Sequence, residues 1–226
     1  MQLSDNTQKI LSNFSNINAS IVIRPGNVIT TISPAKNIFA VAKVEEVFPV
    51  EFAVYSVAEL LKVISLFDAP DINFTDQAAT LKQDNRQLEY VWSSLNIVEP
   101  APSEDKIPDF DFTFSVMITA SDLKNVLDVS ATMKLDLLKF ESDGEKLSLI
   151  GTKAKNPDSN SYELEMMACP LGKPFSIHIT SENLKLIPGD YNCQFNISDA
   201  PNAIVFQNTA SELKYIIAVD GTSILP

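Results

Sequence analysis

The stretch Ile118-Thr119-Ala120-Ser121-Asp122-Leu123-Lys124 returns 61 residues later as Ile179-Thr180-Ser181-Glu182-Asn183-Leu184-Lys185. Both copies place a strand end first, then a hydroxyl that can cap a helix, an acidic residue and the pair Leu-Lys. A looser copy, Tyr55 to Lys62, ends 62 residues before Lys124. Recurrence at a nearly constant spacing indicates an internal repeat, and the repeated unit fixes the architecture to which every site belongs.

A fourth candidate helix, Ser4 to Ile17, opens the chain and carries Lys9 together with apolar residues at helical spacing. Short β-rich runs separated by Pro, Gly and Asn turns occupy most of the remaining chain. The sequence therefore predicts an α+β fold of two similar domains, each with two short helices packed on antiparallel sheets. Predicted strands lie near residues 20–24, 28–33, 38–43, 50–55, 71–74, 79–83 and 87–92, and near 112–118, 135–141, 146–151, 162–168, 175–179, 191–197, 203–206 and 214–219.

The two halves are joined by a segment that differs from them in composition and in periodicity. Residues 96–111 contain three prolines and show no regular period. Proline restricts its own backbone and that of the residue before it, so this segment is predicted to be an extended connector. We therefore predict domains at 1–95 and 112–226, with the connector at 96–111.

Composition excludes several classes of protein. The chain has 226 residues, of which 45% are hydrophobic and 20% charged, as in globular proteins. No apolar run approaches the roughly 18–20 residues that a bilayer requires, and the first residues lack a basic segment and an apolar signal core. These features predict a cytoplasmic protein with no membrane association.

Catalytic and metal-binding signatures are absent from the sequence. His178 is the only histidine, and we expect it to face solvent or a neighbouring subunit from an alternating strand. Cys169 and Cys193 show no metal-ligand spacing and are expected to be buried, reduced thiols. Six glycines form no phosphate-binding loop. The sequence therefore predicts no enzyme activity, no metal and no cofactor.

The formal net charge of −12 argues against a protein that coats nucleic acid with its whole surface. A local basic surface is still compatible with this charge. Each predicted helix places one lysine opposite its apolar stripe, and acids three or four residues away are expected to pair with these lysines as ordinary helix-surface stabilisers. Repetition of the pattern amid amide and hydroxyl side chains favours weak, sequence-independent contact with phosphates. The four lysines are Lys9, Lys62, Lys124 and Lys185.

The order of helix, strands, helix, strands, connector and then the same again resembles the sliding DNA clamps, specifically those of T-even-type bacteriophages. The likeness covers essentially the whole chain but consists of the spacing of elements and of short sequence matches. These matches are residues 11–18, Leu60-Leu61-Lys62-Val63-Ile64-Ser65-Leu66, Asp122-Leu123 with Val129-Ser130, and Leu186-Ile187-Pro188-Gly189-Asp190-Tyr191.

The resemblance implies a homotrimeric ring whose helices line a hole that duplex DNA passes through. Such a ring tethers the replicative DNA polymerase for processive synthesis and serves as a mobile platform for late viral transcription. It also implies a clamp-loader ATPase and late transcription factors as partners, and the cytoplasm of an infected bacterial host as the location. Lys9, Lys62, Lys124 and Lys185 are then the DNA-facing residues, although acids such as Asp5 and Asp128 also occupy candidate inner positions.

Two further sites are implied by the resemblance. The subunit contact is expected to join an edge strand of each domain, and its candidate residues are Leu88, Tyr90, Trp92, Tyr162, Leu164 and Met166. For Trp92, a place in the core of its own domain is the preferred interpretation. Short apolar peptides of partners are expected to dock near the connector and the chain end, at Ile97, Val98, Ile107, Ile224 and Leu225.

Two other functions fit parts of the sequence. A two-domain, β-rich structural or assembly protein would use the same helices and charges without encircling DNA. An enzyme with an unrecognised active site would need a perturbed carboxylate in a deep pocket.

Overall fold

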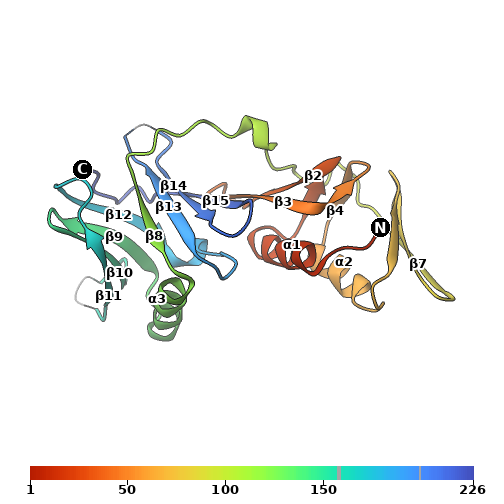
Figure 1. The fold of residues 1–226 in the computed structure, drawn as a ribbon, viewed down its shortest axis with the longest axis horizontal. Coiled ribbons are helices and arrows are strands. Elements are labelled where there is room, and N and C mark those ends of the chain that lie inside the picture. Colours follow the sequence, from red (N-terminus) through yellow and green to blue (C-terminus); the bar gives the residue numbers. More distant parts are fainter. Residues whose placement is uncertain (157–158, 199) are drawn as a thin grey trace. The chain divides into compact units, whose positions relative to one another are not determined.

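The computed structural model describes residues 1–156, 159–198 and 200–226. They form two compact units, Met1–Pro108 and Asp109–Pro226 (Figure 1). The division falls inside residues 96–111, which the sequence predicts as a connector between domains.

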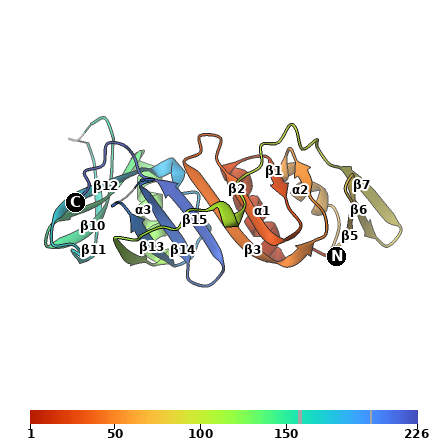
Figure 2. The same ribbon diagram turned by 90° about the horizontal axis from the view of Figure 1, so that it is seen from above.

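The first unit packs two helices on small antiparallel sheets. Strand β1 pairs with β4, and β2 pairs with β3. Strands β5, β6 and β7 form a three-stranded sheet in that order, which Figure 2 shows side by side. Helix α1 contacts β2, β3 and helix α2. The elements are α1 Asp5–Ile17, β1 Ile21–Ile23, β2 Gly26–Ile32, β3 Ile38–Phe48, β4 Phe52–Val54, α2 Val57–Ile64, β5 Asp71–Phe74, β6 Ala78–Gln83, β7 Arg86–Val91 and the 3-10 turn η1 Glu104–Lys106.

The second unit has one α-helix among its described residues and two antiparallel sheets. One sheet has the order β11-β10-β9-β12, and in the other β8 pairs with β13, β13 with β14 and β14 with β15. Helix α3 packs against β10 and β11. The elements are β8 Phe114–Ile118, α3 Ala120–Met133, β9 Leu137–Asp143, β10 Lys146–Thr152, β11 Tyr162–Ala168, β12 Pro174–Thr180, the 3-10 turn η2 Ser181–Asn183, β13 Tyr191–Asn196, β14 Ala203–Asn208 and β15 Leu213–Ala218.

Local capping explains where the helices begin. The side chains of Ser4, Ser56 and Thr119 each accept a hydrogen bond from the backbone N–H three residues later, and α1, α2 and α3 follow. The carboxylate of Glu46 on β3 adds a tie to α1, because it accepts hydrogen bonds from Ser4 N and Thr7 Oγ1. These caps confirm three of the predicted helices.

The fourth predicted helix is wrong, because the chain forms only the three-residue turn η2 there. Thr180 makes no capping bond with its side chain. Pro188 lies too close to allow several turns, and it biases the preceding Ile187 away from helical backbone angles. A helix this short does not repay the cost of nucleation. The second domain therefore lacks the second helix that the sequence predicts, whereas every predicted strand is present, with β3 continuing to Phe48.

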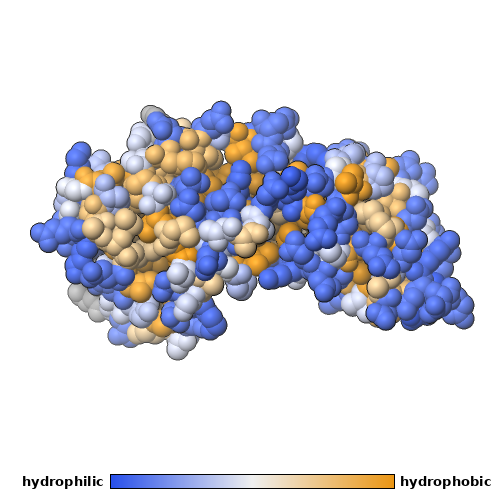
Figure 3. All heavy atoms as spheres, viewed as in Figure 1, coloured by the Kyte–Doolittle hydropathy of each residue, from blue (hydrophilic) through white to orange (hydrophobic). Residues whose placement is uncertain are grey.

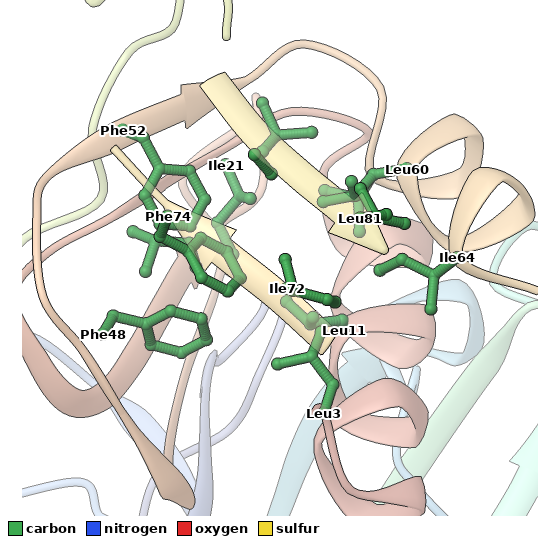
Figure 4. A pocket seen from close by; sticks show the side chains of 14 residues that line it. Leu3, Leu11, Ile21, Phe48, Phe52, Leu60, Ile64, Ile72, Phe74 and Leu81 are labelled. Carbon is green, nitrogen blue, oxygen red and sulfur yellow. The ribbon is translucent and has the colours of Figure 1, made fainter. Parts of the chain in front are cut away.

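An aromatic cluster centres the core of the first unit. Trp92 stacks on Phe52 with ring centroids 4.2 Å apart, and its Nε1 donates to Thr75 O at 2.9 Å. Phe48 and Phe74 meet edge to face at 5.5 Å. Beside them is an apolar cavity of about 20 Å³, into which Leu11, Leu81 and other core side chains point (Figure 4). A space this small holds no more than about one water molecule, so it is a gap in packing and has no room for a ligand.

Candidate functional site

Three of the four predicted DNA-facing lysines project from helices. Lys9 on α1, Lys62 on α2 and Lys124 on α3 are exposed on the faces opposite the buried stripes. Lys185 differs, because it follows η2, is half-buried and lies on no helix. The helix faces therefore carry one lysine each, and the second unit offers only one such face among its described residues.

The electrostatic surroundings of the three helix lysines are not equal. Lys124 forms an ion pair with Asp128 one turn later, as the sequence predicts. Among the described residues, no ion pair involves Lys9 or Lys62, so the expected pairs with Asp5 and Glu59 are not formed. An ion pair between exposed groups neutralises charge at little gain in stability. The positive charge available for a weak phosphate contact is consequently greatest on α1 and α2.

The side chains that neighbour these lysines on the helix faces are polar and largely uncharged. Exposed Ser12 and Asn16 extend the face of α1 that carries Lys9, and exposed Asn125 lies beside Lys124 on α3. Hydroxyl and amide groups donate hydrogen bonds to phosphate oxygens without reading base sequence. Hydrophilic residues also cover much of the surface seen in Figure 3, which agrees with the acidic composition.

Five of the six predicted subunit-contact residues lie on two edge strands, β7 and β11, and Trp92 directly follows β7. On β7, Leu88 and Tyr90 are half-buried, and their cross-strand partners Leu81 and Ala79 are core residues, so both side chains face the interior of the first unit. On β11, Tyr162, Leu164 and Met166 are half-buried. Trp92 is 9% exposed within the aromatic cluster, so it is a core residue of its own unit.

Sequence reasoning missed the apolar side chains that these edge strands leave exposed. Val91 on β7 is 71% exposed and Met167 on β11 is 41% exposed. The alternation of side chains along a strand could have predicted this exposure from the sequence, since Val91 lies on the opposite face from Leu88 and Tyr90. Edge strands present unpaired backbone groups, and an exposed apolar residue on such an edge is typical of a surface that becomes covered.

Charged groups flank the two edges differently. Lys146 Nζ lies 2.9 Å from Glu165 Oε2 on β11, and the hydrogen bond to that carboxylate raises the pKa of Lys146. Glu163 on the same strand is exposed. On the first unit, Arg86 at the start of β7 stacks over the Phe67 ring at 5.2 Å and donates to Gln83 Oε1 at 2.5 Å. The β11 edge is therefore acidic, whereas the β7 edge carries both Arg86 and the exposed Glu89.

The predicted partner-peptide residues differ in accessibility. Ile97 and Ile224 are each 66% exposed, Leu225 is exposed and Ile107 is half-buried. Val98 is 2% exposed and packs with Val22 and Ala53. The assignment of Val98 to a docking surface is therefore wrong, because this side chain holds the connector to its own unit.

Further contacts show that the first part of the connector is fixed. Arg24 Nη2 donates to Ala101 O at 2.7 Å, and Lys36 Nζ lies 2.9 Å from Glu99 Oε1. Together with buried Val98, these contacts hold residues 98–101 against the first unit. An extended segment anchored in this way presents the exposed Ile97 in one place.

The described residues contain no cluster of three or more His, Cys, Asp or Glu side chains that could hold a metal ion. His178 is not on the surface as expected, since it is 8% exposed and lies beneath the chain end. Cys193 is buried as expected, and burial raises the pKa of its thiol, whereas Cys169 is only half-buried. In the described parts of the chain, no helix has both the length and the apolar composition needed to cross a bilayer.

Comparison with known proteins gives consistent results. The family model described as DNA polymerase processivity factor matches residues 4–100. The sliding clamp of Vibrio phage KVP40 is 28% identical over 225 residues, covering 98% of this chain and 100% of the relative. The sliding clamp of Enterobacteria phage T4 is 25% identical over 234 residues, covering 99% and 98%.

Solved structures support the same fold. The structure of A. fulgidus PCNA bound to the C-terminal region of FEN-1 has a TM-score of 0.71 at 12% identity, covering 97% of this chain and 96% of that one. PCNA from Thermococcus kodakaraensis has a TM-score of 0.65 at 14% identity, with 95% and 96% covered. Likeness of fold at such low identity reflects the arrangement of the helices and sheets.

Proposed function

The chain belongs to the sliding-clamp family of DNA polymerase processivity factors, and from this premise we propose that three copies close into a ring that encircles duplex DNA. The ring holds the replicative polymerase on its template and has no catalytic role of its own. Retention is topological, so binding to DNA need not be tight.

The observation that carries this proposal is the set of polar helix faces with one lysine each. Lys9, Lys62 and Lys124 are exposed among hydroxyl and amide groups, within a chain of net charge −12. Tight nucleic-acid binding depends on many phosphate contacts and loses affinity steeply with salt. A few cations on an otherwise acidic chain instead support weak contact that permits sliding. Lys185 joins this set as a candidate with a weaker case, since it lies outside the helices.

The proposed subunit contact pairs the β7 edge of one copy with the β11 edge of the next. Val91 and Met167 supply apolar area at these edges, and acidic Glu163 complements Arg86. Two different surfaces meet in such a contact, so the assembly is head to tail and closes only at a fixed number of copies. Leu88, Tyr90, Tyr162, Leu164 and Met166 support the edge strands from their inner faces.

The proposed partner sites are apolar residues of the connector and the chain end, of which Ile107 is half-buried and the others are exposed. Ile97 and Ile107 in the first unit, and Ile224 and Leu225 in the second, fit short apolar peptides. The partners we propose are the polymerase, a clamp-loading ATPase and late transcription factors, in the cytoplasm of an infected bacterial host.

The test is the retention of protein on DNA whose ends are controlled. Duplex DNA biotinylated at both termini is fixed to a bead by one end, and the chain is added at high concentration so that rings thread over the free end. The free end is then capped with streptavidin and the beads are washed in high salt. The matched control caps the end before the protein is added.

We expect retained protein only when the cap follows the protein. Equal retention in both orders would indicate ordinary binding, and no retention in either order at concentrations where the protein is trimeric would overturn the encircling ring. Sedimentation equilibrium over a concentration series supplies the assembly state and separates a monomeric structural protein from a ring.

A further inference from the structure

A polar hollow of about 410 Å³ lies over strands β9, β10 and β12 of the second unit. Thr152 on β10 and Thr180 on β12 both pair with Leu137 of β9, so these three side chains share one face of the sheet. Lys139 lies two residues further along β9 on the same face, and Lys153 follows the end of β10. The volume is within the range of small-molecule sites.

Several hydrogen-bond donors that line this hollow have no acceptor. Lys139 Nζ lies 3.8 Å from Glu141 Oε2, which is beyond hydrogen-bond distance. Within the part of the chain that the structure describes, the side chains of Lys153, Thr152 and Thr180 make no hydrogen bond. Thr152 is only 7% exposed, so its hydroxyl has little contact with bulk water. A buried hydroxyl without a partner carries a desolvation cost, which a bound acceptor would remove.

The acidic side chains of the hollow are already bonded to the protein. Asp136 Oδ1 accepts from Ala154 N at 2.8 Å. Asp220 Oδ1 accepts from Thr222 N at 2.8 Å and from Thr222 Oγ1 at 2.7 Å. His178 also lines the hollow, and both of its ring nitrogens are within hydrogen-bond distance of hydroxyl oxygens. Among the described residues, the polar side chains of the hollow that make no hydrogen bond can therefore all donate one.

The chemistry of these donors selects a class of ligand. Two ammonium groups and two hydroxyls suit a ligand that is negatively charged and accepts several hydrogen bonds. A phosphate group offers three acceptor oxygens and a charge of about −1.5 to −2, and lysine binds phosphate as a point charge. Because the carboxylates of Asp136 and Asp220 offset the charge of the two lysines, the affinity depends on the hydrogen bonds and is modest.

We propose that this hollow is a binding site for a phosphate group, either as the free ion or as part of a small phosphate ester. Lys139, Lys153 and Thr152 bond the phosphate oxygens, and Thr180, on the other side of Leu137, bonds the remainder of the ligand. The site lies within the second unit, so the proposal does not depend on closure of a ring.

Amide NMR of the intact protein, titrated with ligand at constant pH and ionic strength, tests the site. The probes are inorganic phosphate and deoxyadenosine monophosphate, and sodium chloride is the control for charge screening. We expect both probes to give saturable shifts of the amides of Thr152, Lys153 and Thr180. Tighter binding of the nucleotide assigns the ligand as a phosphate ester, and equal binding assigns it as the free ion.

Variants separate a built site from general attraction to lysine. Thr152→Val removes the hydroxyl at similar volume, and Lys153→Gln removes an exposed ammonium group. Each should raise the dissociation constant for phosphate at least about tenfold, as expected for loss of a hydrogen bond to a charged group. The matched control is Lys155→Gln, at an exposed lysine that does not line the hollow, and it should bind phosphate normally.

Urea unfolding without ligand supplies a second readout. Thr152→Val should be as stable as the unaltered chain, since the hydroxyl that it lacks has no partner within the described residues. The proposal is overturned by shifts that chloride reproduces, by saturable shifts confined to other residues, or by Thr152→Val and Lys153→Gln proteins that bind phosphate as tightly as Lys155→Gln.

Discussion

Val91→Lys tests the proposed subunit contact. Val91 is 71% exposed on the β7 edge, so most of its surface is available for burial by a second copy. Burying a whole valine side chain contributes about 1.5–3 kcal/mol, which gives about 1–2 kcal/mol for the exposed share. A lysine at this position loses that contribution and adds the cost of removing an ammonium group from water.

The loss of contact free energy occurs three times in a closed ring, because the ring has three equal contacts. A loss of about 1–2 kcal/mol at each of three contacts lowers the overall assembly constant by about 10²- to 10⁴-fold. Sedimentation equilibrium over a concentration series measures this constant directly. Fluorescence of Trp92, the only tryptophan, reports whether the aromatic cluster next to β7 is still folded.

The matched control is Val47→Lys, which makes the same chemical change at a valine that is 65% exposed and lies on β3. Its assembly constant should equal that of the unaltered chain. The edge-strand contact is refuted by a Val91→Lys protein that assembles normally. It is equally refuted when the control dissociates to the same extent.

Three further outcomes are expected. Glu46→Gln should destabilise the chain by about 1–3 kcal/mol at pH 7 in urea unfolding, because it weakens the bonds to Ser4 and Thr7. Burial raises the pKa of Glu46, but these bonds lower it by more. The carboxylate's contribution to the free energy of unfolding is therefore lost as the pH falls through the lowered pKa, and the difference in stability between the two proteins should then vanish. A difference that persists in acid contradicts this account. Leu81→Ala should cost about 2–5 kcal/mol by the same measurement, since Leu81 is fully buried beside the core cavity, and a cost under about 1 kcal/mol would mean that the site collapses. Joint replacement of Lys9, Lys62, Lys124 and Lys185 by Glu should leave the fold and the trimer intact but abolish retention of the protein on end-capped DNA. The same change at Lys82, Lys106, Lys155 and Lys173 should leave that retention unchanged. Equal retention of both variant proteins would show that the first four lysines do not face DNA.

Strand positions were predictable from the sequence because alternation and turn residues act locally. Every predicted strand is present, and three of the four predicted helices form where a hydroxyl caps the first turn. The fourth failed where Thr180 gives no such cap and Pro188 follows closely. Leu184 of the repeated Leu-Lys pair directly follows η2 and is buried, so the repeat keeps a core position where no helix forms.

The candidate site was less predictable, because exposure depends on what distant segments cover. His178 lies on an alternating strand, yet Thr222, 44 residues later, covers it. Val98 belongs to a proline-containing segment but is buried against Val22 and Ala53. The two edge strands were expected from the resemblance to sliding clamps, but only the pairing of Leu88 with core residue Leu81 shows which face is inward. That pairing leaves Val91 as the exposed apolar residue.

The missing fourth helix affects the symmetry that a sliding DNA duplex encounters. The described part of each chain supplies three α-helices, two in the first unit and one in the second. In the proposed trimer, the pattern of helices around the hole then repeats once per chain and not once per domain. The potential felt by the phosphates consequently has threefold periodicity, with stronger attraction at the pairs of α1 and α2 and weaker attraction between them, so rotation of DNA inside the ring meets three shallow minima per turn.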